Sequence, residues 1–198
     1  MKHEEFYGDT YPILKSAEQN LLNLINEYPN PVHEDVQTIV YCCSRIKSPE
    51  SMMEKLKKRG LSADLKSALH DVYDAVGIRI ICSFAEDIYL VAAWLKKQPY
   101  IRVIQEKDYF RHPKPNGYRS YHMTLELQSG DEKGYFAEIQ IRTIATDCWA
   151  TLEHQLKYKK EIPHEDLIRS ELKRCADEIA SVDLSMQTIR DIIRTIGH

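Results

Sequence analysis

Two acidic residues far apart in the chain, Asp74 and Glu138, are candidates for holding a divalent cation. Mg²⁺ prefers hard oxygen ligands and binds one or two carboxylates together with substrate phosphates. Residues 107–122, KDYFRHPKPNGYRSYH, offer a matching phosphate site, because they combine Lys and Arg side chains with two prolines and a glycine. Cations on a loop stiffened by prolines make strong, charge-assisted contacts with a polyanion such as a triphosphate, although such a run is also compatible with simple solvation.

A glycine-rich phosphate loop is absent from the sequence. Neither GxxxxGK followed by Ser or Thr nor GxGxxG occurs. A nucleotide site in this chain therefore has to use side-chain cations.

Strand alternation gathers a second group of polar residues on one face of a predicted sheet. They are Arg79, Tyr118, Ser120, His122, Thr124, Glu126, Glu138, Gln140 and Arg142. A sheet normally has one wet face, so exposure to solvent also explains polar residues at these positions. Acids, Arg, His and Tyr are not the usual residues of a merely solvated face. If the strands are neighbours, this mixture favours one concave polar site.

The elements that must position these residues run from helices to a sheet and back to helices. Apolar spacing and turn residues predict helices over 12–28, 33–43, 49–59, Leu65 to Tyr73, 85–97, 144–159 and 165–196, and strands over 77–82, 101–106, 118–128 and 134–142. Ser48 and Pro49 start the third helix and Gly60 ends it. The last two strands are close in sequence, so we expect them to pair antiparallel. The order predicts an α+β fold with a mixed, partly antiparallel sheet of about five strands, flanked by helices and extended by helices at both ends.

Length and composition limit the class of protein. The 198 residues predict a single domain, with 43% hydrophobic and 29% charged residues, which excludes disordered and collagen-like chains. The formal net charge of −3 argues against a general nucleic-acid coat or a polybasic membrane binder. No segment is apolar for long enough to span a bilayer. We therefore expect a soluble, intracellular protein that needs neither a membrane nor a nucleic acid.

The predicted helix over 165–196 carries a long apolar stripe. Its members are Leu167, Ile168, Leu172, Ala176, Ile179, Val182, Met186, Ile189, Ile193 and Ile196. The stripe could pack on its own domain, but a long stripe at the end of a small domain is also suited to contact with another chain. We expect a homo-oligomer that is built partly on this helix.

Four stretches in order resemble the synthetase domain of the RelA/SpoT family, the GTP pyrophosphokinases that make the alarmones pppGpp and ppGpp. They are SRIKSPESMMEK (44–55), DAVGIRIIC (74–82), KDYFRHPKPNGYRSYH (107–122), and EIQIRT with DCWATLEHQLKYK (138–159). The chain's size resembles the small alarmone synthetases. The resemblance implies a nucleotidyltransferase-like fold with its core at about 44–159, N-terminal helices over 12–43 and an oligomerisation helix over 165–196, with a tetramer favoured.

The same resemblance implies a cytoplasmic protein and a reaction in the bacterial stringent response. The β,γ-pyrophosphate of ATP moves to the ribose 3′-hydroxyl of GTP or GDP, and AMP is released. Asp74 and Glu138 would bind Mg²⁺ as the catalytic carboxylates, with Glu138 also taking the proton of the hydroxyl. By resemblance, the ATP-binding residues are Arg45, Lys47, Ser51, Lys55 and Arg79, and the GTP- or GDP-binding residues are Lys114, Tyr118, His122, Gln140, Arg142 and Asp147.

Two alternative functions remain open at this level. Related toxins transfer pyrophosphate to the 3′ end of tRNA, but the net charge of −3 disfavours an RNA-binding surface. A non-catalytic nucleotide sensor does not need both Asp74 and Glu138. Asp147 stands where some family members carry Asn, and an acid there can still accept hydrogen bonds from the edge of a guanine.

Overall fold

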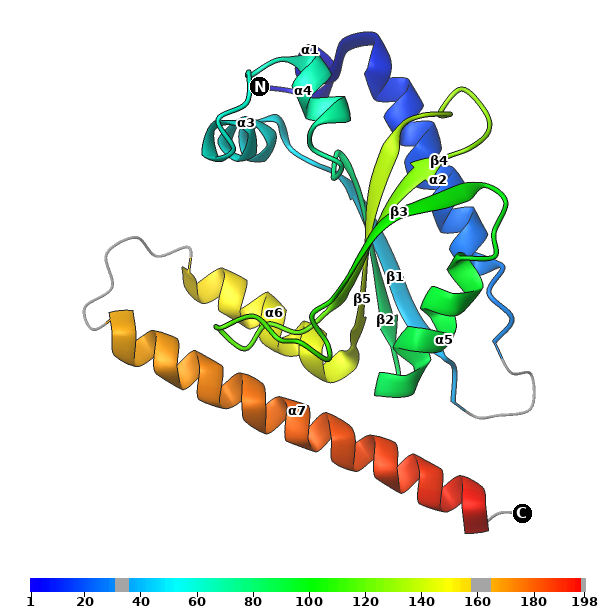
Figure 1. The fold of residues 1–198 in the computed structure, drawn as a ribbon, viewed down its shortest axis with the longest axis vertical. Helices are drawn as coiled ribbons and strands as arrows, with labels where there is room; N and C mark the ends of the chain where they lie inside the picture. The colour runs from blue at the N-terminus through cyan, green and yellow to red at the C-terminus, as the bar shows by residue number, and fades with distance from the viewer. Residues whose placement is uncertain (31–35, 158–164, 197–198) are drawn as a thin grey trace.

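The computed structural model describes residues 1–30, 36–157 and 165–196 as an α+β fold around one five-stranded sheet (Figure 1). The helices are α1 (His3–Tyr7), a 3₁₀ turn (Gly8–Thr10), α2 (Tyr11–Asn26), α3 (Pro49–Lys58), α4 (Leu65–His70), α5 (Ala85–Leu95), α6 (Ile144–Lys157) and α7 (Glu165–Ile196). The strands are β1 (Ile39–Ile46), β2 (Val76–Cys82), β3 (Ile101–Asp108), β4 (Tyr121–Leu127) and β5 (Phe136–Thr143). The predicted fold class is confirmed.

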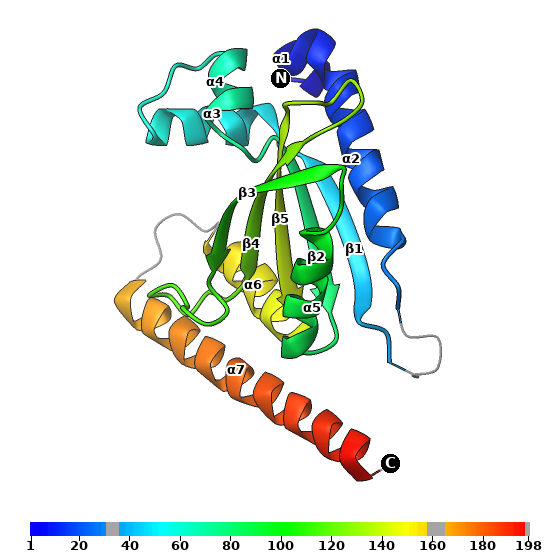
Figure 2. The ribbon, with the colours of Figure 1, turned by 45° about the vertical axis from the view of Figure 1, so that its right-hand side comes forward.

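The sheet is mixed, with the strand order β1-β2-β5-β4-β3. β2 and β5 are parallel, whereas the other neighbouring pairs, including the predicted pair of β4 and β5, are antiparallel. α2 and α5 cover one face of the sheet. On the other side, α3 and α4 lie near one end of the sheet, and α6 and α7 lie near the other end (Figures 1 and 2). Each strand therefore has one face against the α2 and α5 layer and one face toward the open side.

The buried face of the sheet follows from strand alternation. Val76, Ile78 and Ile80 of β2 are buried in the same cluster as Leu14 and Leu21 of α2. Burying apolar side chains at this interface is the main driving force that holds the helices on the sheet. The intervening β2 residues face the open side, and they include Arg79.

The third predicted helix has the expected ends. The Ser48 side chain accepts a hydrogen bond from the Ser51 amide at 3.3 Å, which satisfies a free amide of the first turn of α3. At the other end, Gly60 adopts φ +67°. Its amide donates to the Lys57 carbonyl, and the Leu61 amide donates to the Leu56 carbonyl. This pair of bonds closes the helix at the glycine, because only glycine adopts the left-handed conformation at little cost.

The predicted helix over 33–43 is wrong where the structure describes it. Residues 31–35 lie outside the described residues, and from Ile39 onward the chain forms the edge strand β1. β1 pairs antiparallel with β2, with Ser44 opposite Ile78. A long-range partner satisfies the backbone groups of the segment, and its β-branched and aromatic residues fit a pleated surface better than a helix.

Other boundaries move by a few residues. The helix predicted through Tyr73 ends at His70, and the strands predicted to begin at 118 and 134 begin at Tyr121 and Phe136. Residues 158–159 of the sixth predicted helix lie outside the described residues. Tyr118 therefore precedes the ladder of β4, and its backbone carbonyl instead accepts a hydrogen bond from the Lys114 amide at 3.1 Å.

The apolar stripe of α7 does not pack on the sheet along its whole length. Ala176 is buried against α6, but Val182, Met186, Ile189 and Ile193 are exposed. The buried residues of the second half of α7 are polar, namely Asp183, Gln187 and Arg190. Among the residues that the structure describes, none of the helices combines the length and the apolar composition that a membrane span requires.

Candidate active site

A row of polar residues crosses three strands on the open face of the sheet. Arg79 of β2 lies opposite Gln140 of β5, and Gln140 lies opposite His122 of β4. Residues directly opposite each other in a ladder share a face, and Glu138 and Arg142 share that face because they alternate with Gln140 along β5. The parallel pairing of β2 with β5 and the antiparallel pairing of β4 with β5 therefore bring these predicted site residues together.

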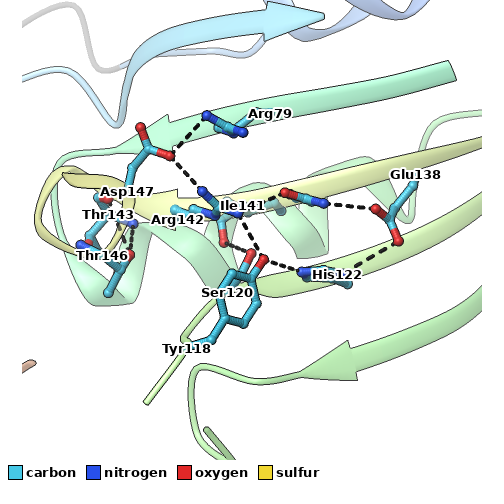
Figure 3. Close-up of polar contacts among 11 residues, drawn as sticks. Arg79, Tyr118, Ser120, His122, Glu138, Ile141, Arg142, Thr143, Thr146 and Asp147 are labelled. Atoms are coloured by element: carbon cyan, nitrogen blue, oxygen red, sulfur yellow. Dashed lines mark hydrogen bonds and ion pairs between the residues drawn. The ribbon is translucent and has the colours of Figure 1, made fainter. Parts of the chain in front are cut away.

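Four of these side chains and that of Tyr118, just before β4, form a closed ring of polar contacts, here called the polar ring (Figure 3). Gln140 Nε2 donates to Glu138 Oε2 at 2.8 Å, and Arg142 Nη2 donates both to Gln140 Oε1 and to Tyr118 Oη at 2.9 Å. Tyr118 Oη lies 2.8 Å from His122 Nε2, and His122 Nδ1 lies 3.6 Å from Glu138 Oε1. In the tautomer with hydrogen on Nδ1, Tyr118 donates to Nε2 and the Nδ1 hydrogen is directed toward Glu138. The ring fixes the orientation of all five groups.

The polar ring keeps the Glu138 carboxylate ionised. Burial by itself would raise the pKa of Glu138, but the interactions with His122, with help from Gln140 and Lys55, outweigh burial. The net effect lowers the pKa to about 2. A carboxylate with hydrogen-bond donors around it is stabilised in its charged form, so Glu138 is available to a cation or a hydroxyl donor at neutral pH.

Asp74 meets Glu138 at one pocket although the two residues are far apart in the chain. Asp74 lies in the turn before β2, and both residues line a pocket with Arg45, Arg79 and Gln140. Lys47 Nζ and Lys55 Nζ approach Asp74 Oδ2 at 2.8 Å and 2.5 Å. The other oxygen, Oδ1, is buried without a hydrogen-bond partner. A buried carboxylate oxygen without a partner is costly unless a cation or donor completes it.

The carboxylates of Asp74 and Glu138 fit a magnesium site that is completed by substrate. Within the described ranges, no three His, Cys, Asp or Glu side chains gather closely enough to form a metal site by themselves. Two hard carboxylates and the unpartnered Asp74 Oδ1 leave room for phosphate oxygens and water, which is the coordination that Mg²⁺ prefers.

An acidic residue connects the pocket to the polar ring. Asp147, in the first turn of α6, accepts from Arg142 Nη1 at 2.8 Å and lies 3.4 Å from Arg79 Nη1. Arg45 comes from β1, and its side chain passes over Gly77, where an added Cβ would lie 3.7 Å from Arg45 Cγ. Arg45 of β1 and Arg79 of β2, the two arginines that are predicted to bind adenine, thus project from neighbouring strands into one pocket.

The loop before β4 adds aromatic and basic groups. Lys114 Nζ lies over the rings of Tyr109 and Tyr118, at 4.6 Å and 4.9 Å from their centroids. Tyr109 also contacts the His122 ring edge to face, at 5.2 Å. Sequence reasoning missed Tyr109, although an aromatic residue within the basic stretch 107–122 was an available signal.

Ser51 is the predicted site residue that lies apart from the others. Its hydroxyl accepts a hydrogen bond from Ser48 Oγ at 3.0 Å in the first turn of α3, and it lies outside the described lining of the pocket. All the other predicted residues line the pocket, belong to the polar ring or contact a residue that does one or the other.

A family comparison decides what kind of protein has this arrangement. The profile described as "Region found in RelA / SpoT proteins" matches residues 44–163. The chain belongs to the RelA/SpoT family. GTP pyrophosphokinase YwaC of Bacillus subtilis is 37% identical over 185 residues, which cover 91% of this chain and 87% of YwaC.

Solved structures of family members share the fold. A GTP pyrophosphokinase family protein from Streptococcus pneumoniae has a TM-score of 0.80 and 33% identity, with 99% of this chain and 97% of that chain covered. Small alarmone synthetase 1 from Bacillus subtilis, bound to its product pppGpp, also has a TM-score of 0.80, with 28% identity and coverage of 96% and 97%. The similarity therefore includes the N- and C-terminal helices as well as the RelA/SpoT region.

Proposed function

We propose that this protein is a GTP pyrophosphokinase of the small alarmone synthetase type, which transfers the β,γ-pyrophosphate of ATP to the ribose 3′-hydroxyl of GTP or GDP. The observation that carries the proposal is the convergence of Asp74 and Glu138 on one pocket, between two arginines and the polar ring. Family membership and the similarity to a synthetase with bound pppGpp support it. Both substrates are cytoplasmic nucleotides, so we propose the cytoplasm as the compartment and the whole of 1–198 as one synthetase domain.

On the donor side, planar guanidinium groups suit a purine. Arg45 and Arg79 project from adjacent strands, and adenine would pack against them because guanidinium planes stack on aromatic rings. Lys47 and Lys55 would turn from Asp74 toward the ATP phosphates once a cation takes their place at its carboxylate. Ser51, at the N-terminus of α3, would donate to the same phosphates.

On the acceptor side, the Tyr118 ring would carry the guanine. Lys114 lies over that ring, so a stacked guanine would displace Lys114 toward the acceptor phosphates, which His122 also faces. Gln140 and Arg142 would line the cleft, with Asp147 at the guanine edge. In proteins that bind single-stranded nucleic acids, the stacking of one base on an aromatic side chain contributes about 1–3 kcal/mol.

The chemical step needs the 3′-hydroxyl aligned with the β-phosphorus of ATP. The hydroxyl oxygen forms a bond to the β-phosphorus, the bond from that phosphorus to the bridging oxygen of AMP breaks, and AMP leaves with the bonding electrons. Glu138 would receive the hydroxyl proton. Because its low pKa makes it a weak base, it takes the proton only as the new bond makes the hydroxyl more acidic. Bound Mg²⁺, held by Asp74 and Glu138, would neutralise phosphate charge.

A product assay tests the proposal. The purified protein is incubated with labelled ATP, Mg²⁺ and either GTP, GDP or tRNA, and the products are resolved. We expect AMP together with pppGpp or ppGpp, and a decrease in rate of about 10²- to 10⁴-fold in Asp74→Asn and Glu138→Gln. Asp131→Asn, which changes an exposed acid in a turn, serves as the control and should retain the parent rate. Transfer to tRNA alone, or no transfer by the folded parent, would refute the proposed function.

We also propose that the protein is a homo-oligomer that associates through α7. The exposed residues Val182, Met186, Ile189 and Ile193 follow one another at helical spacing and form an apolar stripe on the surface of α7. A second copy would bury this surface, and the family resemblance favours a tetramer. Light scattering at micromolar concentration should give a multiple of the 23.1 kDa chain mass. Met186→Glu with Ile193→Glu should shift the protein toward the monomer, whereas a parent that is already monomeric would rule out the proposal.

A further inference from the structure

We propose that Asp183 of α7 is a positioning residue for the acceptor side of the site, acting through the hydroxyl of Thr143. Asp183 lies outside the pocket and outside the four stretches that carry the family resemblance. The inference rests on the proposed function, because it assigns Asp183 a part in binding the acceptor nucleotide.

The contact between Asp183 and Thr143 is buried and specific. Asp183 is 5% exposed, and its Oδ2 accepts a hydrogen bond from Thr143 Oγ1 at 2.7 Å. Thr143 is fully buried at the end of β5, and Thr146 beside it is 4% exposed. A buried carboxylate is expensive unless it is hydrogen-bonded. Apolar residues would pack this part of α7 with less cost, so an acid at this position suggests a use for its acceptor oxygen.

Thr143 and Thr146 form a reciprocal cap at the start of α6. The Thr146 amide donates to Thr143 Oγ1 at 3.1 Å, and the Thr143 amide donates to Thr146 Oγ1 at 3.0 Å. A hydroxyl has a single hydrogen, and Thr143 donates its hydroxyl hydrogen to the Asp183 carboxylate. The lone pairs of Thr143 Oγ1 are then directed to the Thr146 amide. Asp183 thus orients the cap that joins β5 to α6.

This turn carries two members of the proposed acceptor site. Arg142 directly precedes Thr143, and Asp147 directly follows Thr146. Arg142 Nη1 donates a hydrogen bond to Asp147 Oδ1 at 2.8 Å (Figure 3). Arg142 in turn donates to Tyr118 at 2.9 Å. A shift of the turn would move Arg142 away from the ring on which guanine would stack, while the Asp74 and Lys47 side of the site would stay in place. The expected consequence is selective for the acceptor.

Other polar contacts of α7 provide a comparison. Gln187, one helical turn after Asp183 on the same buried face, accepts a hydrogen bond from the Glu86 amide of α5 at 3.2 Å. Arg190 pairs with Asp87 at 2.8 Å, also on α5. These contacts hold α7 on the domain without touching the turn between β5 and α6. Gln187→Ala is therefore a matched control for the general loss of a buried α7 contact.

The test measures KM for GTP and for ATP separately, together with kcat, in the full-length protein. We expect Asp183→Ala to raise the KM for GTP about tenfold, because a hydrogen bond to a charged group is lost. The KM for ATP should change by less than about twofold. In Gln187→Ala, the KM for GTP and the KM for ATP should each change by less than about twofold. Asp183→Asn keeps an oxygen acceptor for Thr143 and should restore the GTP KM to within about threefold of the parent.

A second variant carries the test if Asp183→Ala does not fold. Asp183→Asn combined with Thr143→Val removes the hydroxyl without leaving a buried charge, and it should show the same selective rise in the GTP KM. An unchanged GTP KM in these folded variants, an equal rise in both KM values, or the same rise in Gln187→Ala would overturn the inference. A parent protein that transfers no pyrophosphate would instead be a failure of the proposed function.

Discussion

Asp147 Oδ1 lies 3.4 Å from Arg79 Nη1, so an ion pair joins the proposed adenine side of the pocket to the polar ring. The same oxygen accepts from Arg142 at 2.8 Å. In the proposed function, Arg79 packs on adenine and Asp147 contacts guanine. Without substrates, the Arg79 guanidinium and the Asp147 carboxylate hold each other in place. A substrate that binds one of them weakens this ion pair and so changes the surroundings of the other.

Asp147→Asn should affect the two substrates differently. The substitution keeps the size of the side chain but removes its charge, and it releases Arg79 for adenine. We expect the KM for GTP to rise about tenfold, from the loss of charge-assisted hydrogen bonds, while the KM for ATP does not rise. Steady-state kinetics with each substrate varied in turn measure both effects. Asp166→Asn, at an exposed acid of α7, is the control, and an equal increase in both KM values would contradict the assignment.

Gly117 is required where the loop before β4 meets α7. Its φ is +87°, and a Cβ added there would lie 2.5 Å from the Ala176 Cβ of α7. Gly117→Ala should therefore combine backbone strain with a steric clash. We expect a loss of about 2–4 kcal/mol in the free energy of unfolding, measured by urea denaturation.

A second glycine separates backbone strain from the clash at Gly117. Gly134 also has φ +87°, but a Cβ added there meets no atom within 4 Å. Gly134→Ala should cost only the strain of the left-handed conformation, about 1–2 kcal/mol. If the two variants are equally destabilised, close packing against α7 is not what demands the glycine at Gly117.

Tyr7 connects the N-terminal helix α1 to the phosphate side of the site. Its side chain is fully buried, and its hydroxyl donates to the Lys47 carbonyl at 2.8 Å. Tyr7→Phe leaves that carbonyl without this donor, and we expect a loss of about 1–2 kcal/mol in the free energy of unfolding. Tyr73→Phe, at an exposed tyrosine, should cost much less. Urea denaturation compares the two, and an equal cost would show that the Tyr7 hydrogen bond does not stabilise the fold.

Ionisation of Glu138 makes the free energy of unfolding of the metal-free protein depend on pH in the acid range. The polar ring lowers the Glu138 pKa in the folded state from an ordinary value of 4.5 to about 2. The unfolded state therefore binds the proton more readily than the folded state. The stabilising contribution of ionised Glu138 is complete above about pH 4.5 and is lost as the pH falls toward 2. Urea denaturation at several pH values gives the free energy of unfolding as a function of pH. As the pH falls, this free energy should decrease less steeply in Glu138→Gln than in the parent. The same pH dependence in both proteins would contradict the prediction.

Local patterns in the sequence predicted a large part of the fold. The helix over Pro49–Lys58 follows from Ser48, Pro49 and Gly60, because caps and chain stops act on neighbouring backbone groups. Alternation along β5 placed Glu138, Gln140 and Arg142 on one face. The side-chain period of a strand is a property of its backbone and needs no partner to be read.

Contacts between distant segments decided the features that local patterns left open or predicted wrongly. Ile39–Ile46 became a strand because β2 satisfies its backbone, and Asp74 reaches Glu138 because β2 and β5 are parallel neighbours. The sequence by itself determined which residues are present for the chemistry and which local elements hold them. The tertiary structure decided which of them meet, and in the second half of α7 it turned polar Asp183 toward the domain instead of the apolar stripe. The physical reason is that the hydrogen-bond partners and the burial of a segment depend on its neighbours in space. These neighbours lie far away along the chain.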